Sequence, residues 1–165
     1  MFWHRYQYTS SLPPEEFEAQ LKALLQVERE NTLATHLFKL RDVPGDTIQG
    51  KLDKQRLTFW RTNYVWNGSF YPVFKLDWEA NDTVQLAVRT RLNLLAESIV
   101  VIIGLGFFVW LLDFVLDSSI TGAQMLARLG LGAVVFFIFM AIPLYSYHSL
   151  RKQSLHGLEE YLRLQ

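Results

Sequence analysis

The stretch SIVVIIGLGFFVWLL at residues 98–112 decides the fold of this 165-residue chain, because it contains no charged side chain. A second uncharged run, LGLGAVVFFIFMAIPLYSY at residues 129–147, follows after a short connection. A helix rises about 1.5 Å per residue, and the hydrocarbon core of a bilayer, about 30 Å thick, needs about 20 apolar residues. Because the first run reaches that length with its flanks, the sequence predicts transmembrane helices over residues 95–116 and 127–147.

Basic residues beside the two runs predict the orientation of this hairpin. Arg89 and Arg91 precede the first run. Arg151 and Lys152 follow the second, whereas the connection over residues 117–128 carries a single arginine. Lys and Arg are enriched in the cytoplasmic loops of membrane proteins. We therefore expect a multi-pass protein of the cell inner membrane, with both termini in the cytoplasm.

The residues before the hairpin have the patterns of an α+β domain. The segment Leu12-Pro13-Pro14-Glu15-Glu16 is typical of a helix start, because proline fits the first turn and acidic side chains favour its positive end. Beyond this helix the apolar period changes to two, which indicates strands. About five antiparallel strands are predicted, over residues 36–41, 47–52, 56–62, 70–76 and 83–92.

Three details of this domain bear on the sheet. Pro72 predicts an edge strand or a bulge, because proline cannot donate to a strand ladder. Asn67-Gly68 is typical of a hairpin turn. The aromatic residues within positions 2–8 fit either a strand or arm packed on the domain, or rings lying among lipid headgroups.

The C-terminal residues predict an amphipathic helix. Leu155, Leu158 and Leu162 recur at helical spacing. This helix fits docking on the sheet, on the membrane or on a second subunit. The expected fold is thus an α+β membrane protein with a cytoplasmic domain over residues 1–91, a transmembrane hairpin over residues 92–147 and an amphipathic helix over residues 148–165.

Small residues on the two apolar runs are candidates for helix packing. Small side chains allow membrane helices to approach closely, either within the hairpin or between copies of the chain. The candidates are Gly104, Gly106, Gly130, Gly132 and Ala133.

Two carboxylates bracket the first run. At the helical rise, Glu97 and Asp113 each lie about 12 Å from its midpoint, close to the edge of a hydrocarbon core about 30 Å thick. Polar groups within a span are costly and often functional. Interfacial positions explain both residues, and a proton or ion site at Asp113 is the alternative.

Catalytic and cofactor motifs are missing from the sequence. It contains no cysteine, its four histidines are scattered, and no phosphate-binding loop or metal-ligand spacing is present. We therefore expect no enzyme activity, no cofactor and no metal.

The net charge is zero, which argues against nucleic acid as a partner. The basic residues Lys51, Lys54, Arg56 and Arg61 fit a solvated face or attraction to anionic lipid.

From Phe38 to about Trp110 the sequence resembles a group of uncharacterised bacterial two-pass membrane proteins. The shared pattern is Gly50 followed by alternating residues, then Asn67-Gly68-Ser69-Phe70-Tyr71-Pro72-Val73-Phe74, then a strand that enters a membrane hairpin. Gly68 interrupts an Asn-Ser-Phe-x-Pro-like element of that group. The resemblance implies a bacterial origin and assigns no activity to any residue.

These observations favour a non-enzymatic membrane protein that presents a small cytoplasmic β-domain for protein or lipid interaction. An oligomeric channel or transporter accessory subunit is the alternative. The expected partners are the lipid bilayer and either a second copy of the chain or another membrane protein.

Overall fold

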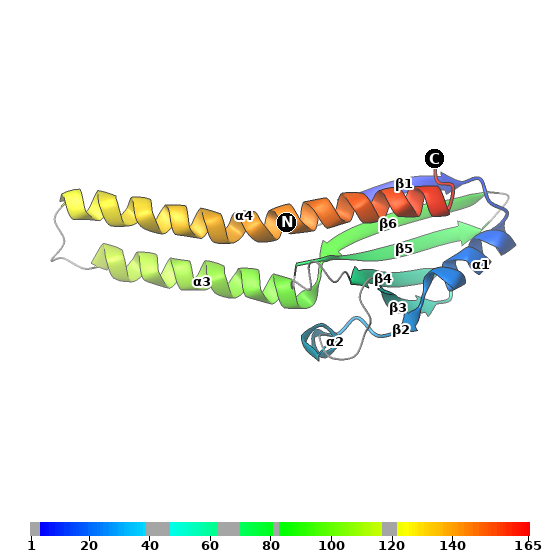
Figure 1. The fold of residues 1–165 in the computed structure, drawn as a ribbon, viewed down its shortest axis with the longest axis horizontal. Coiled ribbons are helices and arrows are strands. Elements are labelled where there is room, and N and C mark those ends of the chain that lie inside the picture. The colour runs from blue at the N-terminus through cyan, green and yellow to red at the C-terminus, as the bar shows by residue number, and fades with distance from the viewer. Residues whose placement is uncertain (1–3, 39–46, 63–69, 81–82, 117–121) are drawn as a thin grey trace.

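The computed structural model describes residues 4–38, 47–62, 70–80, 83–116 and 122–165, which form a sheet domain and two long helices (Figure 1). The elements in chain order are β1 (His4–Ser10), α1 (Pro14–Leu24), β2 (Val27–Glu28), α2 (Leu33–Phe38), β3 (Thr47–Asp53), β4 (Arg56–Thr62), β5 (Pro72–Ala80), β6 (Val84–Leu92), α3 (Leu94–Leu116) and α4 (Gly122–Tyr161). The α+β class predicted from the sequence is confirmed.

The sheet has six strands in the order β1-β6-β5-β4-β3-β2. All neighbouring strands are antiparallel except β2 and β3, which are parallel. The prediction of about five antiparallel strands is therefore confirmed only in part, since the sheet has six strands and the β2–β3 pair is parallel. β1 supplies the N-terminal edge of the sheet and pairs along its whole length with β6.

The strand expected over residues 36–41 was wrong. Residues 33–38 form the short helix α2, and residues 39–41 lie outside the described part of the chain. Thr32 provides the reason: its Oγ1 accepts a hydrogen bond from the Thr35 backbone N at 3.2 Å, and its carbonyl accepts one from the His36 backbone N at 3.2 Å. A threonine in this position favours a helix start.

Pro72 begins β5, which lies in the middle of the sheet between β4 and β6. The expectation of an edge strand was thus wrong. Proline is compatible with the first residue of a strand, where its missing N–H interrupts little of the ladder. The turn expected at Asn67-Gly68 lies outside the described residues.

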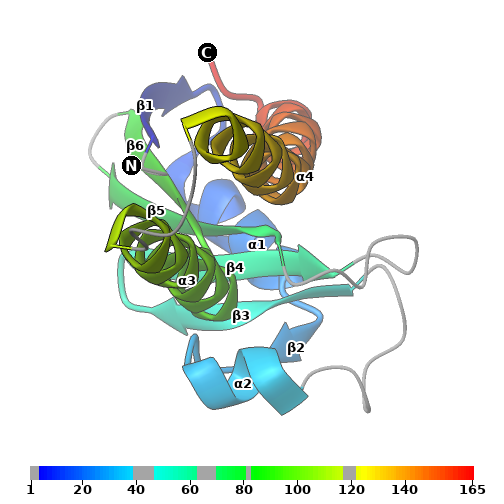
Figure 2. The ribbon, with the colours of Figure 1, turned by 90° about the vertical axis from the view of Figure 1, so that its left-hand side faces the viewer.

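One face of the sheet is covered by α1 and by the C-terminal half of α4 (Figure 2). The C-terminal helix therefore docks on the sheet, which was the first of the three placements expected from the sequence. The core between them buries Leu12, Phe17, Leu21, Leu57, Phe59, Phe74, Leu76, Trp78, Val84, Leu86, Val88, Leu155, Leu158 and Leu162. Polar contacts complete the docking, since Ser10 Oγ donates to the Leu162 carbonyl at 2.7 Å.

Beyond the sheet, α3 and the N-terminal half of α4 run side by side (Figure 1). Within the described residues, these two helices are long and apolar enough to cross a membrane, with mean hydropathies of 2.4 and 2.3. Only 6% of the apolar window of α3 and 0% of that of α4 is buried. A core helix of a soluble protein would be mostly buried, so this exposure is compatible with membrane spans.

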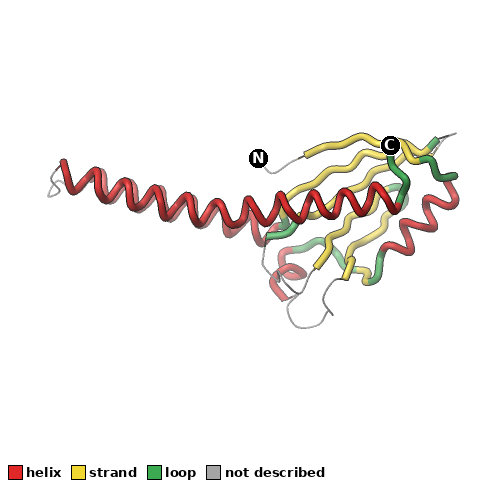
Figure 3. The backbone as a smooth tube through the Cα atoms, turned by 45° about the horizontal axis from the view of Figure 1, so that its top comes forward, coloured by secondary structure: helices red, strands yellow, loops and turns green. Residues whose placement is uncertain are grey.

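The second apolar run and the C-terminal helix are one element. α4 extends from Gly122 to Tyr161 and continues through Pro143 (Figure 3). Its 40 residues give a length of about 60 Å. A single rod therefore joins the exposed apolar surface to the core of the sheet.

Candidate functional site

The face of the sheet opposite α1 and α4 carries the polar side chains of alternate strand positions. We call it the open face. Its described side chains on the five longer strands include Arg5, Gln7, Thr9, Lys51, Asp53, Arg56, Thr58, Lys75, Asp77, Glu79, Gln85, Ala87, Arg89 and Arg91. These residues are exposed or half-buried, whereas most of the alternate positions on β5 and β6 are buried. The open face is therefore a polar surface of the sheet that neither α1 nor α4 covers.

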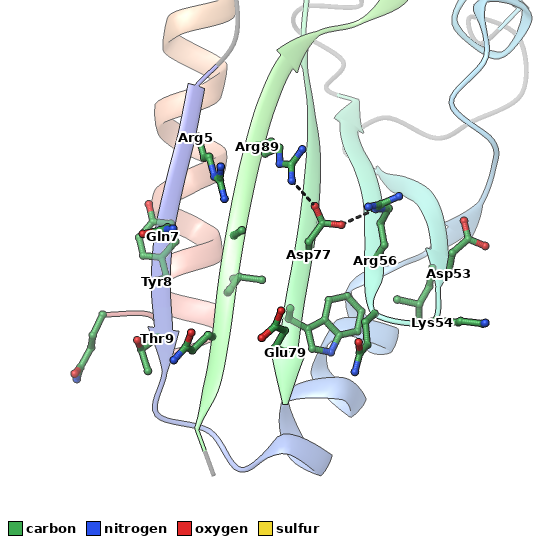
Figure 4. Close-up of a pocket in the computed structure, with 17 residues that line it drawn as sticks. Arg5, Gln7, Tyr8, Thr9, Asp53, Lys54, Arg56, Asp77, Glu79 and Arg89 are labelled. Atoms are coloured by element: carbon green, nitrogen blue, oxygen red, sulfur yellow. Dashed lines mark hydrogen bonds and ion pairs between the residues drawn. The ribbon is translucent and has the colours of Figure 1, made fainter. Parts of the chain in front are cut away.

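A hollow of about 1060 Å³ lies on the open face (Figure 4). Ala87 contributes to its lining, between Gln7 on β1 and Asp77 on β5 in the strand register. Three arginines from different strands, Arg5, Arg56 and Arg89, also line it. The small side chain of Ala87 leaves room between these longer neighbours.

Asp77 holds two of those arginines. Arg56 Nε donates to Asp77 Oδ1 at 2.5 Å, and Arg89 Nη2 lies 3.5 Å from Asp77 Oδ2. The carboxylate thereby links β4, β5 and β6, as the dashed lines of Figure 4 show. One carboxylate faces two guanidinium groups, so this trio retains a net positive charge.

The strand register also sets cations directly beside one another. Arg89 is the partner of Arg5 on β1 and of Lys75 on β5. Arg91 lies two residues further along β6 on the same face. We call Arg5, Lys75, Arg89 and Arg91 the basic cluster. Burial, followed by the charges of Arg91 and Arg56, lowers the pKa of the Lys75 ammonium. Like charges directly opposite on neighbouring strands are destabilising, so the basic cluster favours the approach of an anion.

The acidic residues of the open face lie further from α3. Asp77 and Glu79 follow Lys75 along β5 and face positions 85–87 of β6, away from the end where β6 enters α3. Asp53 lies opposite Arg56 at the far end of β3. Positive charge is thus concentrated on the half of the face next to the long helices.

A buried junction connects this face to α3. Asn93 separates β6 from α3 and is completely buried. Its Oδ1 accepts a hydrogen bond from the Ala96 backbone N at 2.9 Å, and its Nδ2 donates to the Tyr71 carbonyl at 3.2 Å. The side chain caps the helix and holds it to the start of β5, so the sheet and α3 have almost no linker between them.

Replacing Asn93 with alanine removes the cap and the contact to Tyr71. We expect a loss of about 2 kcal/mol of unfolding free energy, the upper end for an N-cap, because both hydrogen bonds are buried. Asn93→Ser keeps a neutral acceptor for the start of the helix and should lose less. Denaturant unfolding of the full chain in detergent, followed by circular dichroism, measures both variants. An alanine variant as stable as the parent would contradict this role.

A second set of buried polar groups lies under α2. His36 Nδ1 shares a hydrogen bond with Tyr71 Oη at 2.5 Å, and His36 Nε2 shares one with Asn31 Oδ1 at 2.6 Å. The His36 ring packs edge-on against Trp60 at 5.1 Å between centroids. Burial raises the pKa of the Tyr71 phenol. These contacts hold α2 against the end of the sheet that adjoins α3.

Tyr71→Phe keeps the ring and removes the hydroxyl that meets His36. We expect a cost of about 1–3 kcal/mol, since a buried polar contact is lost without a change of shape. Tyr161→Phe is the matched control, because Tyr161 is exposed. Thermal unfolding of both variants in the same detergent tests this, and equal stabilities would show that the hydroxyl contributes nothing.

The residues singled out from the sequence lie mainly on the long helices. A Cβ atom added to Gly132 would lie 2.2 Å from the Trp110 ring, so this glycine faces α3. A Cβ at Gly104, Gly106 or Gly130 would meet nothing within 4 Å. Ala133 lies beside Gly132 and is half-buried. Their use in packing between copies of the chain stays a prediction.

The two bracketing carboxylates lie near the two ends of α3. Glu97 is in its first turn, and Asp113 is exposed three residues before its end.

The four basic residues singled out between positions 51 and 61 do not share one face. Alternation places Lys51 and Arg56 on the open face and Arg61 on the opposite side. Lys54 lies in the turn between β3 and β4. The structure brings none of these four residues, and neither of the two carboxylates, into the basic cluster.

The sequence reasoning missed the basic cluster as a unit. From the sequence, Arg89 and Arg91 were used only to predict the orientation of the hairpin. Alternation along Val84–Leu92 nevertheless places both on one face of the strand. Among the described residues, no group of three or more His, Asp or Glu side chains is placed to hold a metal ion. No protein-family model matches this chain, and no curated protein or solved structure is significantly similar to it.

Proposed function

We propose that this chain is a non-enzymatic two-pass membrane protein that holds a small sheet at the membrane surface as a binding module for protein or lipid. The continuity of α4 carries this proposal. Its first half exposes large apolar side chains such as Leu131 and Phe137, and its second half buries Leu155 and Leu158 in the sheet core. Because one helix does both, the domain follows the orientation of the span.

The basic residues on both flanks support an inner-membrane protein with cytoplasmic termini. Arg89 and Arg91 precede α3, and Arg151 and Lys152 lie on α4 beyond its uncharged stretch. In this orientation the open face lies in the cytoplasm, beside the inner leaflet. A reporter fused after Gln165 that is active only outside the cytoplasm would contradict it.

The open face is the surface we assign to binding. A photo-crosslinking residue at Ala87, in the hollow, should capture a discrete protein or lipid product when the full chain is in its native membrane. The same residue at Gln153, exposed on α4, is the control. Identical products at both positions would count against a dedicated face.

The alternative of a channel or transporter accessory subunit makes a separate prediction. Purified chain in liposomes should then support ion flux, and that flux should persist when the sheet face is altered. Flux measurements on the parent protein and on Asp113→Asn distinguish the two functions. A flux that depends on Asp113 would favour the alternative over the binding module.

A further inference from the structure

We infer that the basic cluster binds the anionic phospholipid headgroups of the leaflet at which α3 enters the membrane. The inference rests on the proposed function, and it names the ligand for one half of the open face. Its grounds are the height of the cluster above the membrane, its excess of positive charge and the position of the acidic residues.

The height of the basic cluster above the membrane follows from β6, the strand that carries Arg89 and Arg91. β6 leads directly into α3, and a strand rises about 3.3 Å per residue. Arg91 and Arg89 therefore lie about 7 and 13 Å from Asn93 along the strand. The headgroup layer extends roughly 5–7 Å beyond each side of the hydrocarbon core. Asn93 itself lies about 18 Å from the midpoint of the uncharged run, or about 3 Å outside the hydrocarbon core. Arg91 thus lies within side-chain reach of the headgroups, and Arg89 lies about a Debye length above them.

The register places the other cations at the height of Arg89. Arg5 and Lys75 are its direct neighbours on β1 and β5, so three cations form a row across the strands. The strands run away from the end at which α3 begins (Figure 1), so a row across them faces a flat membrane at nearly one distance. A single row can then attract several headgroups at once.

The charges of this row are mostly unmatched within the protein. In the described part of the chain, no carboxylate forms an ion pair with Arg5 or Lys75. Arg89 contacts Asp77 at 3.5 Å and shares it with Arg56. Clusters of Lys and Arg beside a membrane helix attract anionic lipid over about a Debye length, which is roughly 8 Å at physiological salt.

The acidic residues decide between a lipid surface and a soluble anion. A soluble anionic partner that filled the hollow would also meet Asp77 and Glu79, which line it. A membrane approaches from the α3 end of the face, so it meets the basic cluster before Glu79, and before Asp77, whose Oδ2 lies 3.5 Å from Arg89 Nη2. The arrangement of charge therefore favours headgroups over a soluble anion.

The absence of cysteine makes a site-specific test direct. Gln7→Cys on the open face, and separately Gln153→Cys on α4, would carry a fluorophore in the full chain. The protein is reconstituted in phosphatidylcholine vesicles, with or without about a third of phosphatidylglycerol, each containing a lipid with a spin-labelled headgroup. Quenching of the fluorophore by that lipid reports how close each position comes to the membrane surface.

We expect phosphatidylglycerol to increase quenching at Gln7 about twofold or more and to change it little at Gln153. The double variant Lys75→Gln/Arg89→Gln should abolish the increase. Lys22→Gln/Arg163→Gln removes the same charge from exposed positions outside the hollow and should preserve it. Raising NaCl from 0.15 to 0.5 M should weaken the increase. Circular dichroism confirms that each variant is folded.

Equal quenching in both vesicles, or an increase that survives Lys75→Gln/Arg89→Gln, would overturn the inference. Inorganic phosphate that removed the increase at constant ionic strength would also overturn it, since the site would then prefer a soluble anion. Washing the vesicles with carbonate distinguishes a failure of the headgroup inference from a failure of the proposed function. Chain that washes off without detergent refutes membrane anchoring, whereas retained chain with lipid-independent quenching refutes only the headgroup contact.

Discussion

Alanine at Gly50 is expected to destabilise the sheet by about 3 kcal/mol, the upper end of the usual range for overpacking. A Cβ atom at this position would lie 2.1 Å from the Thr58 carbonyl oxygen and 2.7 Å from the Phe59 Cα. Both are backbone atoms of β4, so they cannot move without shifting the strand. Gly50 pairs with β2 as well as β4, which leaves β3 little freedom to retreat.

Gly157→Ala provides the control for this substitution. Gly157 lies in α4, and a Cβ there would meet nothing within 4 Å. Alanine should therefore stabilise the helix by up to about 1 kcal/mol. Denaturant unfolding in one detergent should shift in opposite directions for the two variants. A Gly50→Ala protein as stable as the parent would show that β3 and β4 can separate without cost.

Leu158→Ala is expected to cost about 2–5 kcal/mol and to loosen the C-terminal half of α4 from the sheet. Leu158 is buried in the core with Leu155 and Leu162, and truncation there leaves a cavity at the centre of the docked helix. The first half of α4 should be unaffected, because its contacts are elsewhere.

Limited proteolysis measures that loosening separately from global unfolding. Arg151 is buried in the docked helix, so trypsin should cleave after it only when α4 detaches. We expect much faster cleavage at Arg151 in Leu158→Ala and an unchanged rate in the matched control Tyr161→Ala, whose side chain is exposed. An unchanged rate in both variants would show that Leu158 does not hold the helix in place.

The parts of the fold that the sequence predicted are those with local signals. Two prolines and two glutamates indicated the start of α1, and alternation indicated the four strands β3 to β6. β1 was one of two alternatives for the aromatic N-terminus, because its partner β6 is about 80 residues away in the chain. Nothing local to residues 4–10 specifies that pairing.

The composition of the open face was also difficult to predict, because it depends on pairing between strands that are distant in the chain. Alternation alone places Arg89 and Arg91 on one side of β6, so half of the basic cluster was accessible from the sequence. Arg5 and Lys75 join them only through the pairing of β1 and β5 with β6. A register shift of one residue would turn their side chains to the other face, and neither register can be derived from composition or spacing.

The unbroken α4 has a mechanical consequence. In the proposed membrane orientation, a rod of about 60 Å, half beside α3 and half on the sheet, would act as a lever with its pivot near the membrane surface. A tilt of 10° about that pivot would displace the far end of the domain by about 5 Å, given an arm of about 30 Å. Tilting is one way in which membrane helices adapt to a bilayer thinner than their apolar length. In the proposed arrangement, a thinner bilayer that tilts the hairpin would therefore tilt the sheet by the same angle.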